Sequence, residues 1–151
     1  MEVARGRKST RRSGVTLIEM LIVVTIIATV ISVSFPALTA GLAGIRLRSA
    51  SGSVASFLTS AMNNVERREQ PAAILVEPKE NLLAVFTAAS GEEPGETLKM
   101  PQGIAIEGDE NRRFLLFPGG SFPHITIVLK NEKGAQRSIE IDPVTAVPKI
   151  Q

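Results

Sequence analysis

The chain has 151 residues, of which 44% are hydrophobic, and its formal net charge is +2. This length is enough for one domain with an appendage. The absence of cysteine excludes a disulfide framework and a thiolate metal site, and a single histidine leaves a histidine-based metal site without a second imidazole.

Positive charge is concentrated at the amino end of the chain. The first 14 residues carry a net charge of +4, from five cations against Glu2: Arg5, Arg7, Lys8, Arg11 and Arg12. Because the whole chain is +2, the residues from Val15 onward sum to −2. The basic pI therefore belongs to this leader, and we do not expect a nucleic-acid partner.

Residues 15–35 form an apolar segment whose only charge is Glu19. A helix of this length spans about 30 Å, the thickness of the hydrocarbon core of a membrane. The cations before the segment predict that the N-terminus stays in the cytoplasm and that the rest lies outside. The composition fits either a signal anchor or a secretory signal with a long apolar region.

Glu19 is an unexpected residue in such a segment. A carboxylate at the centre of a membrane span costs about 2.5–3.5 kcal/mol, and less near an interface. The cost indicates that Glu19 has a partner elsewhere. The alternative is that Glu19 lies near the lipid headgroups and is only tolerated.

The stretch RRSGVTLIEMLIVVTIIATVISVSFPAL (11–38) resembles the class III signal of type IV pilins and type II secretion pseudopilins. In that family a prepilin peptidase cuts after a glycine that ends a basic leader, and the new N-terminus is methylated. The resemblance implies that cleavage falls between Gly14 and Val15 and that Val15 is N-methylated. The first mature residue is usually Phe, so Val15 departs from the pattern.

The resemblance also implies a role for Glu19, which is the glutamate at the fifth mature position. Cleavage after Gly14 frees an amine at Val15, and a buried carboxylate and a buried ammonium offset each other when they pair. In the family, the glutamate of an incoming subunit meets the N-terminus of its neighbour in the filament. Glu19 is therefore expected to be an assembly element. Pro36, at mature position 22, falls where many family members bend their helix.

These features divide the chain into three predicted regions. Residues 1–14 are a cleaved leader, 15–38 a transmembrane and assembly helix, and 39–151 a periplasmic globular domain. Beyond Pro36 the helix should resume, partly melted at Gly41–Gly44 because glycine weakens helices. It should end near Arg68–Gln70, because Pro71 disfavours helix before it. Its apolar positions follow spacings of three and four: Ala43, Leu47, Ala50, Val54, Phe57, Leu58, Ala61, Met62 and Val65.

After Pro71 the apolar period changes to two, which predicts strands. The expected segments are a hairpin of 72–76 and 82–87, short strands at 98–100 and 104–107, a strand at 113–117, a hairpin of 125–129 and 139–141, and an edge strand at 144–150. Together they predict an α+β, pilin-like fold, a long helix packed on one antiparallel sheet of six to eight strands. The outline resembles the H-type minor pseudopilin, with FLLFPGGS (114–121) before the last hairpin.

The sequence offers little for catalysis or ligand binding. His124, beside Pro123, is interpreted as a loop or strand-end residue. Asp109 and Glu110 could contribute to a calcium site, but the spacing of a calcium loop is absent and a solvated turn is favoured. We therefore predict no catalytic, cofactor-binding or metal residues, no cofactor and no small-molecule substrate.

The first functional hypothesis is a minor pseudopilin, a structural subunit of the type II secretion pseudopilus that supports protein export. It would be a single-pass inner-membrane protein that assembles with other pseudopilins after processing by prepilin peptidase. The alternative is a minor pilin of a type IV or competence pilus, active in adhesion or DNA uptake. A third hypothesis, a signal-anchored periplasmic binding protein or enzyme, predicts no processing at Gly14.

Overall fold

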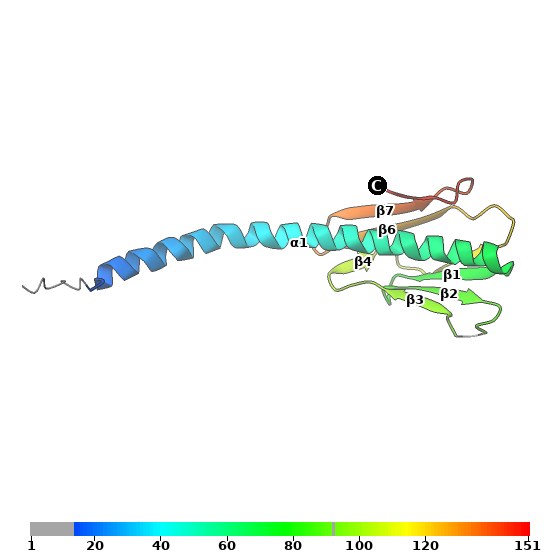
Figure 1. Cartoon of the computed structure of the whole chain (residues 1–151), viewed down its shortest axis with the longest axis horizontal. Coiled ribbons are helices and arrows are strands. Elements are labelled where there is room, and N and C mark those ends of the chain that lie inside the picture. Colours follow the sequence, from blue (N-terminus) through cyan, green and yellow to red (C-terminus); the bar gives the residue numbers. More distant parts are fainter. Residues whose placement is uncertain (1–13, 92) are drawn as a thin grey trace, which may run out of the picture. The chain divides into compact units, whose positions relative to one another are not determined.

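A computed structural model describes residues 14–91 and 93–151, with the side chains of 36–40 excepted. The helix α1 (Leu17–Arg68) comes first (Figure 1). Eight strands follow it: β1 (Ala72–Glu77), β2 (Leu82–Thr87), β3 (Glu96–Lys99), β4 (Ile104–Ile106), β5 (Arg112–Leu116), β6 (Ile125–Asn131), β7 (Gln136–Ile141) and β8 (Pro148–Ile150). The predicted α+β class is confirmed.

The chain divides into two compact units, Met1–Leu38 and Thr39–Gln151. The first unit holds the apolar beginning of α1. The second unit holds the remainder of α1 together with every strand that the structure describes. Each unit is considered below by itself.

The helix α1 is continuous over 52 residues, so the prediction of a melted stretch at Gly41–Gly44 is wrong. Each glycine costs about 1 kcal/mol in a helix, and the buried face that begins at Leu47 outweighs this. Pro36 lies inside α1, but its side chain is outside the described residues, and the bend there remains a prediction. The helix ends at Arg68 as predicted, and Glu69 follows with φ 52°, a left-handed helix-terminating conformation.

One face of the second half of α1 is buried, as the apolar spacing predicted. The buried residues are Leu47, Ala50, Val54, Phe57, Leu58, Ala61, Met62 and Val65. Of the predicted set, Ala43 is only half-buried. Ser51 is buried as well, which was not predicted, and its hydroxyl donates to the Leu47 carbonyl at 2.8 Å. That bond makes burial of the hydroxyl tolerable.

The strands form two four-stranded sheets, so the prediction of one sheet is wrong. Sheet A has the order β3-β2-β1-β5 and sheet B the order β4-β6-β7-β8. The chain passes from sheet A to sheet B after β3, returns to sheet A for β5, and continues in sheet B from β6. Alternation of apolar residues shows which side chains face a core, but it does not specify the neighbouring strand.

Both predicted hairpins are confirmed. In sheet A, β1 pairs with β2 in an antiparallel register that puts Ala72 opposite Thr87. In sheet B, β6 pairs with β7, with Ile125 opposite Ile141. The predicted edge strand at 144–150 is shorter than expected and begins at Pro148, because a proline is best accommodated at the first residue of an edge strand.

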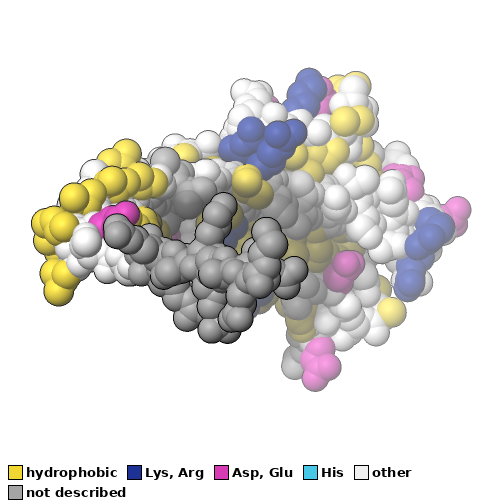
Figure 2. Space-filling model, turned by 60° about the vertical axis from the view of Figure 1, so that its left-hand side comes forward, with side chains coloured by type: hydrophobic (Ala, Val, Ile, Leu, Met, Phe, Trp, Pro, Cys, Tyr) yellow, Lys and Arg dark blue, Asp and Glu magenta, His cyan; other side chains and the backbone are white. Residues whose placement is uncertain are grey.

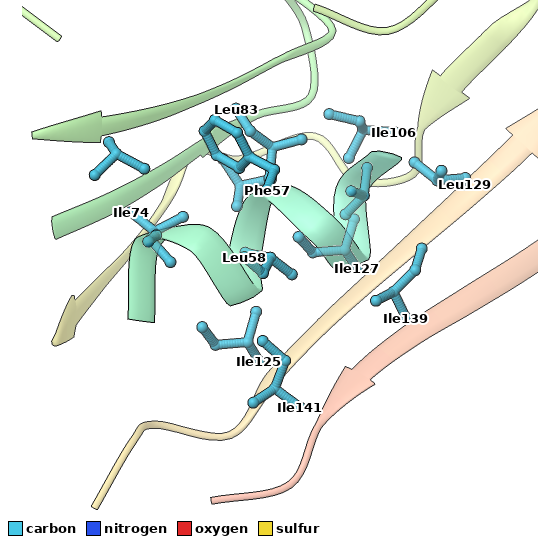
Figure 3. Close-up of a cluster of buried hydrophobic side chains, with 14 of the residues drawn as sticks. Phe57, Leu58, Ile74, Leu83, Ile106, Ile125, Ile127, Leu129, Ile139 and Ile141 are labelled. Carbon is cyan, nitrogen blue, oxygen red and sulfur yellow. The ribbon is translucent and has the colours of Figure 1, made fainter. Parts of the chain in front are cut away.

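Both sheets turn their apolar faces toward the second half of α1, and the three elements share one core. Figure 3 shows the side chains of α1 and of both sheets converging on this core. From α1 come Phe57 and Leu58, and from sheet A Ile74 and Leu83; sheet B contributes Ile106, Ile125, Ile127, Leu129, Ile139 and Ile141. Packing alone therefore holds this unit together, without disulfides.

The side chain of Asn81, in the β1–β2 turn, connects the two sheets. Its Nδ2 donates to the carbonyl of Ile104 at 2.6 Å, and its Oδ1 accepts from the N–H of Ile106 at 2.8 Å. These bonds satisfy the backbone of β4, an edge strand of sheet B. Asn81 has φ 59°, a left-handed conformation that Asn adopts more readily than most residues.

Candidate assembly site

The amino end of α1 is built by Thr16 and Glu19. The hydroxyl oxygen of Thr16 accepts a hydrogen bond from the N–H of Glu19 at 3.3 Å, and the Thr16 carbonyl accepts from the N–H of Met20 at 3.2 Å. Thr16 thus caps the helix, with a glutamate three residues later, which is the spacing of a capping box. This capping role of Thr16 could be predicted from the T-x-x-E pattern, although it was not predicted above.

Gly14 is exposed and lies just before the helix. A Cβ atom added to it would meet nothing within 4 Å, and its φ is not in the left-handed region. The described fold therefore gives no packing or conformational reason for glycine at this position. The preceding residues of the predicted leader, 1–13, lie outside the described residues.

Val15 and Glu19 lie at the same end of the helix, about one turn apart. Both are exposed, with 67% of Val15 accessible. The ion pairs of residues 14–91 and 93–151 are His124–Glu140 and Lys149–Asp142, and neither involves Glu19. Glu19 thus has no ion-pair partner within this part of its own chain.

The apolar helix surface that carries Glu19 spans Leu17–Phe35, with a mean hydropathy of 2.5 and none of the segment buried. By length and composition this segment could cross a membrane, and α1 is the one helix among the described residues of which this is true. Figure 2 shows hydrophobic side chains gathered over this part of the molecule. Exposure of such an apolar surface to water is unfavourable in free energy, so we expect lipid or other apolar helices to cover it.

Three hydroxyl side chains of this surface form hydrogen bonds within the helix. The hydroxyl of Thr25 donates to the Leu21 carbonyl at 2.8 Å, and the hydroxyl of Thr29 donates to the Thr25 carbonyl at 2.8 Å. The hydroxyl of Ser32 donates to the Ala28 carbonyl at 2.9 Å. These three hydroxyls donate within the helix and do not need water as an acceptor, whereas Glu19, the one charged residue of the span, needs a partner.

The other residues considered as candidate ligands belong to the second unit. His124 Nε2 is 3.4 Å from Glu140 Oε1 and 3.3 Å from Thr126 Oγ1, and the three side chains are exposed or half-exposed. Asp109 and Glu110 are exposed in the turn between β4 and β5. Within the described residues, no three acidic or histidine side chains are grouped so that they could hold a metal ion.

The two sheets differ on their outward faces. On sheet A, Phe86 and Leu115 flank Ala73 from the neighbouring strands, and Leu115 is 52% exposed. On sheet B, the outward residues Glu140 and Lys149 are charged and lie opposite each other on β7 and β8. Sheet B therefore has the polar outer face usual for an antiparallel sheet, whereas the outer face of sheet A is apolar around Ala73 and carries Arg113 beside Leu75.

The protein family described as the prokaryotic N-terminal methylation motif matches residues 9–35. No curated protein matches the chain. The structure is similar to the minor pseudopilin EpsH from the type 2 secretion system of Vibrio cholerae, with a TM-score of 0.59 and 9% identity over 70% of this chain and 96% of that chain. It is also similar to the type IV minor pilin FimU of Pseudomonas aeruginosa, with a TM-score of 0.50 and 15% identity over 70% of this chain and 86% of that one. At these identities the likeness shows a common fold.

Proposed function

We propose that the chain is a filament subunit, and specifically a minor pseudopilin of a type II secretion pseudopilus. The chain is type IV pilin-like in both its amino-terminal motif and its fold. The observation that carries the proposal is the match of residues 9–35 to the methylation motif, in a chain that exposes Glu19 unpaired on an apolar helix.

Processing would come first in this proposal. A prepilin peptidase would cut between Gly14 and Val15, and the new N-terminus would be methylated. In support, the described fold does not itself require a glycine at 14. Before assembly, the apolar helix would anchor the subunit in the inner membrane, with residues 39–151 in the periplasm.

Assembly would then depend on electrostatic pairing between subunits. The amine of Val15 and the carboxylate of Glu19 are opposite charges, both needing compensation in an apolar bundle of helices. Pairing of Glu19 with the N-terminus of a neighbouring subunit would neutralise both. It would also select one axial register, because a shifted subunit would leave two charges buried and unpaired. Glu19 would thus position subunits and take no part in catalysis.

The test of processing is the intact mass of the protein purified from its native membrane. We expect a chain that starts at Val15 and carries one added methyl group. In cells without prepilin peptidase, the same measurement should return a chain that still carries residues 1–14. A chain that starts at Met1 in cells with the peptidase would contradict the proposal.

A second candidate function is a minor pilin of a type IV pilus, which is supported by the likeness to FimU. The likenesses to EpsH and to FimU, at 9% and 15% identity, support a filament subunit of either kind. Deletion of the gene separates the two functions. Loss of export of folded proteins with pili intact would support the pseudopilin, and loss of pili with export intact would support the pilin. An exported binding protein or enzyme, the third hypothesis, would change neither phenotype.

A further inference from the structure

The beginning of the second unit exposes large apolar side chains outside the apolar span. Leu42 is 53% exposed and Ile45 is 67% exposed, although both follow Phe35, where the span ends. They are three residues apart, so they share one side of α1. The buried side of the helix begins at Leu47 and Ala50, which face the sheets.

Two arginines accompany this apolar pair. Arg46 and Arg48 are exposed, and neither takes part in an ion pair of residues 14–91 and 93–151. On a helix they project to either side of Ile45, because successive residues are separated by about 100°. No acidic residue occurs between Glu19 and Glu66 in the sequence, so this part of α1 is purely cationic. We call Leu42, Ile45, Arg46 and Arg48 the collar.

The collar is separated from the span by only a few residues of chain. Leu42 follows Phe35 by seven residues and Arg48 follows it by thirteen. Even a fully extended chain of thirteen residues covers only about 45 Å. If the span lies in a membrane, the collar therefore remains near the surface of that membrane, at a high effective concentration of headgroups.

The chemistry of the collar matches that of a membrane interface. Apolar side chains with flanking arginines are typical of helical segments that lie at the boundary between acyl chains and headgroups. Guanidinium groups bind phosphate oxygens in a bidentate manner. Cations on the exported side of a span also run against the usual distribution of charge in membrane proteins, so their presence calls for a local partner.

We propose that the collar docks on anionic phospholipid headgroups of the membrane that the span crosses. Leu42 and Ile45 would enter the boundary with the acyl chains, while Arg46 and Arg48 would bind lipid phosphates. The inference rests on the proposed membrane anchoring. It adds a second, salt-sensitive attachment of the subunit, which must be released when the subunit leaves the bilayer for a filament.

The lack of cysteine allows a test with a single reporter. Ser49 is exposed one turn after Ile45, and Ser49→Cys can carry a fluorophore without altering the collar. Ser60, exposed three turns further along α1, provides the matched control Ser60→Cys. The labelled full-length chains would be placed in vesicles of phosphatidylcholine with or without phosphatidylglycerol, and the quencher would be a lipid with a nitroxide on its headgroup.

In vesicles with phosphatidylglycerol, we expect the label at position 49 to be quenched at least twofold more than the label at position 60. Added salt, omission of phosphatidylglycerol, or the double substitution Arg46→Gln and Arg48→Gln should reduce the difference. Equal quenching at the two positions, or quenching unaffected by the double substitution, would overturn the inference. Extraction of the chain from the same vesicles by alkaline carbonate would instead overturn the membrane anchoring itself.

Discussion

Glu19 carries the one charge of the apolar span, and one pair of substitutions separates the effect of that charge from the effect of its polar side chain. Glu19→Ala removes the whole polar side chain together with its charge, whereas Glu19→Gln keeps a polar side chain of the same length and removes only the charge; in both variants the N–H of residue 19 can still donate to the Thr16 hydroxyl oxygen. If pairing with a neighbour's amine governs assembly, both variants should lose incorporation into the filament. Leaving one charge of a buried pair alone costs about 3–5 kcal/mol, which is a hundredfold to several thousandfold change in an association constant.

Crosslinking of each Glu19 variant to its partner subunits is the measurement. Cleavage after Gly14 serves as the internal control, because the leader and the scissile bond are unchanged. Normal crosslinking of Glu19→Gln, with reduced crosslinking of Glu19→Ala, would contradict the pairing of charges and assign the effect to the polar side chain itself.

Asn81 is a second residue whose substitution can be tested, because its side chain bonds to the backbone of β4 as well as lying in the β1–β2 turn. Asn81→Ala would leave the carbonyl of Ile104 and the N–H of Ile106 without their partner, and would place alanine at φ 59°. We expect the free energy of unfolding to fall by about 2–4 kcal/mol. Asn81→Gly loses the same bonds without the backbone strain, and should be about 1 kcal/mol less harmful than Asn81→Ala. Urea denaturation would measure both, and equal stability of wild type and Asn81→Ala would refute the bridging role.

Among the elements, α1 is the one whose burial is most directly testable. Phe57 is 6% exposed and lies between the helix and sheet A, so Phe57→Ala should lower the free energy of unfolding by about 3–5 kcal/mol. Ser56→Ala, next to it on the exposed side, should change it by less than about 0.5 kcal/mol. Thermal denaturation of both variants checks the assignment, and similar effects would show that the packed side of α1 is wrongly assigned.

The elements also show what the sequence could predict. The strand β6, ITIVLKN, alternates cleanly, and its buried residues Ile125, Ile127 and Leu129 were identified correctly. The strand β1, AAILVE, is apolar on both sides, so its core face could not be distinguished. The division into two sheets was also missed, because it depends on pairings between distant segments.

The candidate site was more accessible to prediction than the sheets, since its pattern is local and contiguous. The capping role of Thr16 was overlooked because the residues before Glu19 were considered only as part of a cleavage signal and an apolar span. The contact of Asn81 with β4 could not have been predicted, because nothing in a polar turn specifies which edge strand lies beside it.

At the scale of the whole molecule, the core lies entirely in the second unit. Residues 39–151 contain the buried face of α1 and both sheets, whereas the described side chains of the first unit, 14–35, are exposed. We therefore expect a chain starting at Thr39 to fold as a soluble monomer, with one cooperative unfolding transition that is insensitive to reductant. Calorimetry with and without dithiothreitol, together with the mass in solution, checks this. Aggregation or a broad transition would show that the apolar helix is required for folding.

If residues 39–151 are exported as proposed, the interleaving of strands between the two sheets has a consequence for that export. Sheet A is complete when β5 has left the translocation channel, but the opposite side of α1 remains uncovered until β6 and β7 follow. Stable folding thus depends on contacts between segments far apart in sequence, which slows folding relative to a helical bundle. A subunit on its way through the membrane would therefore remain threadable almost to its last residues, and would close only after transport is nearly finished.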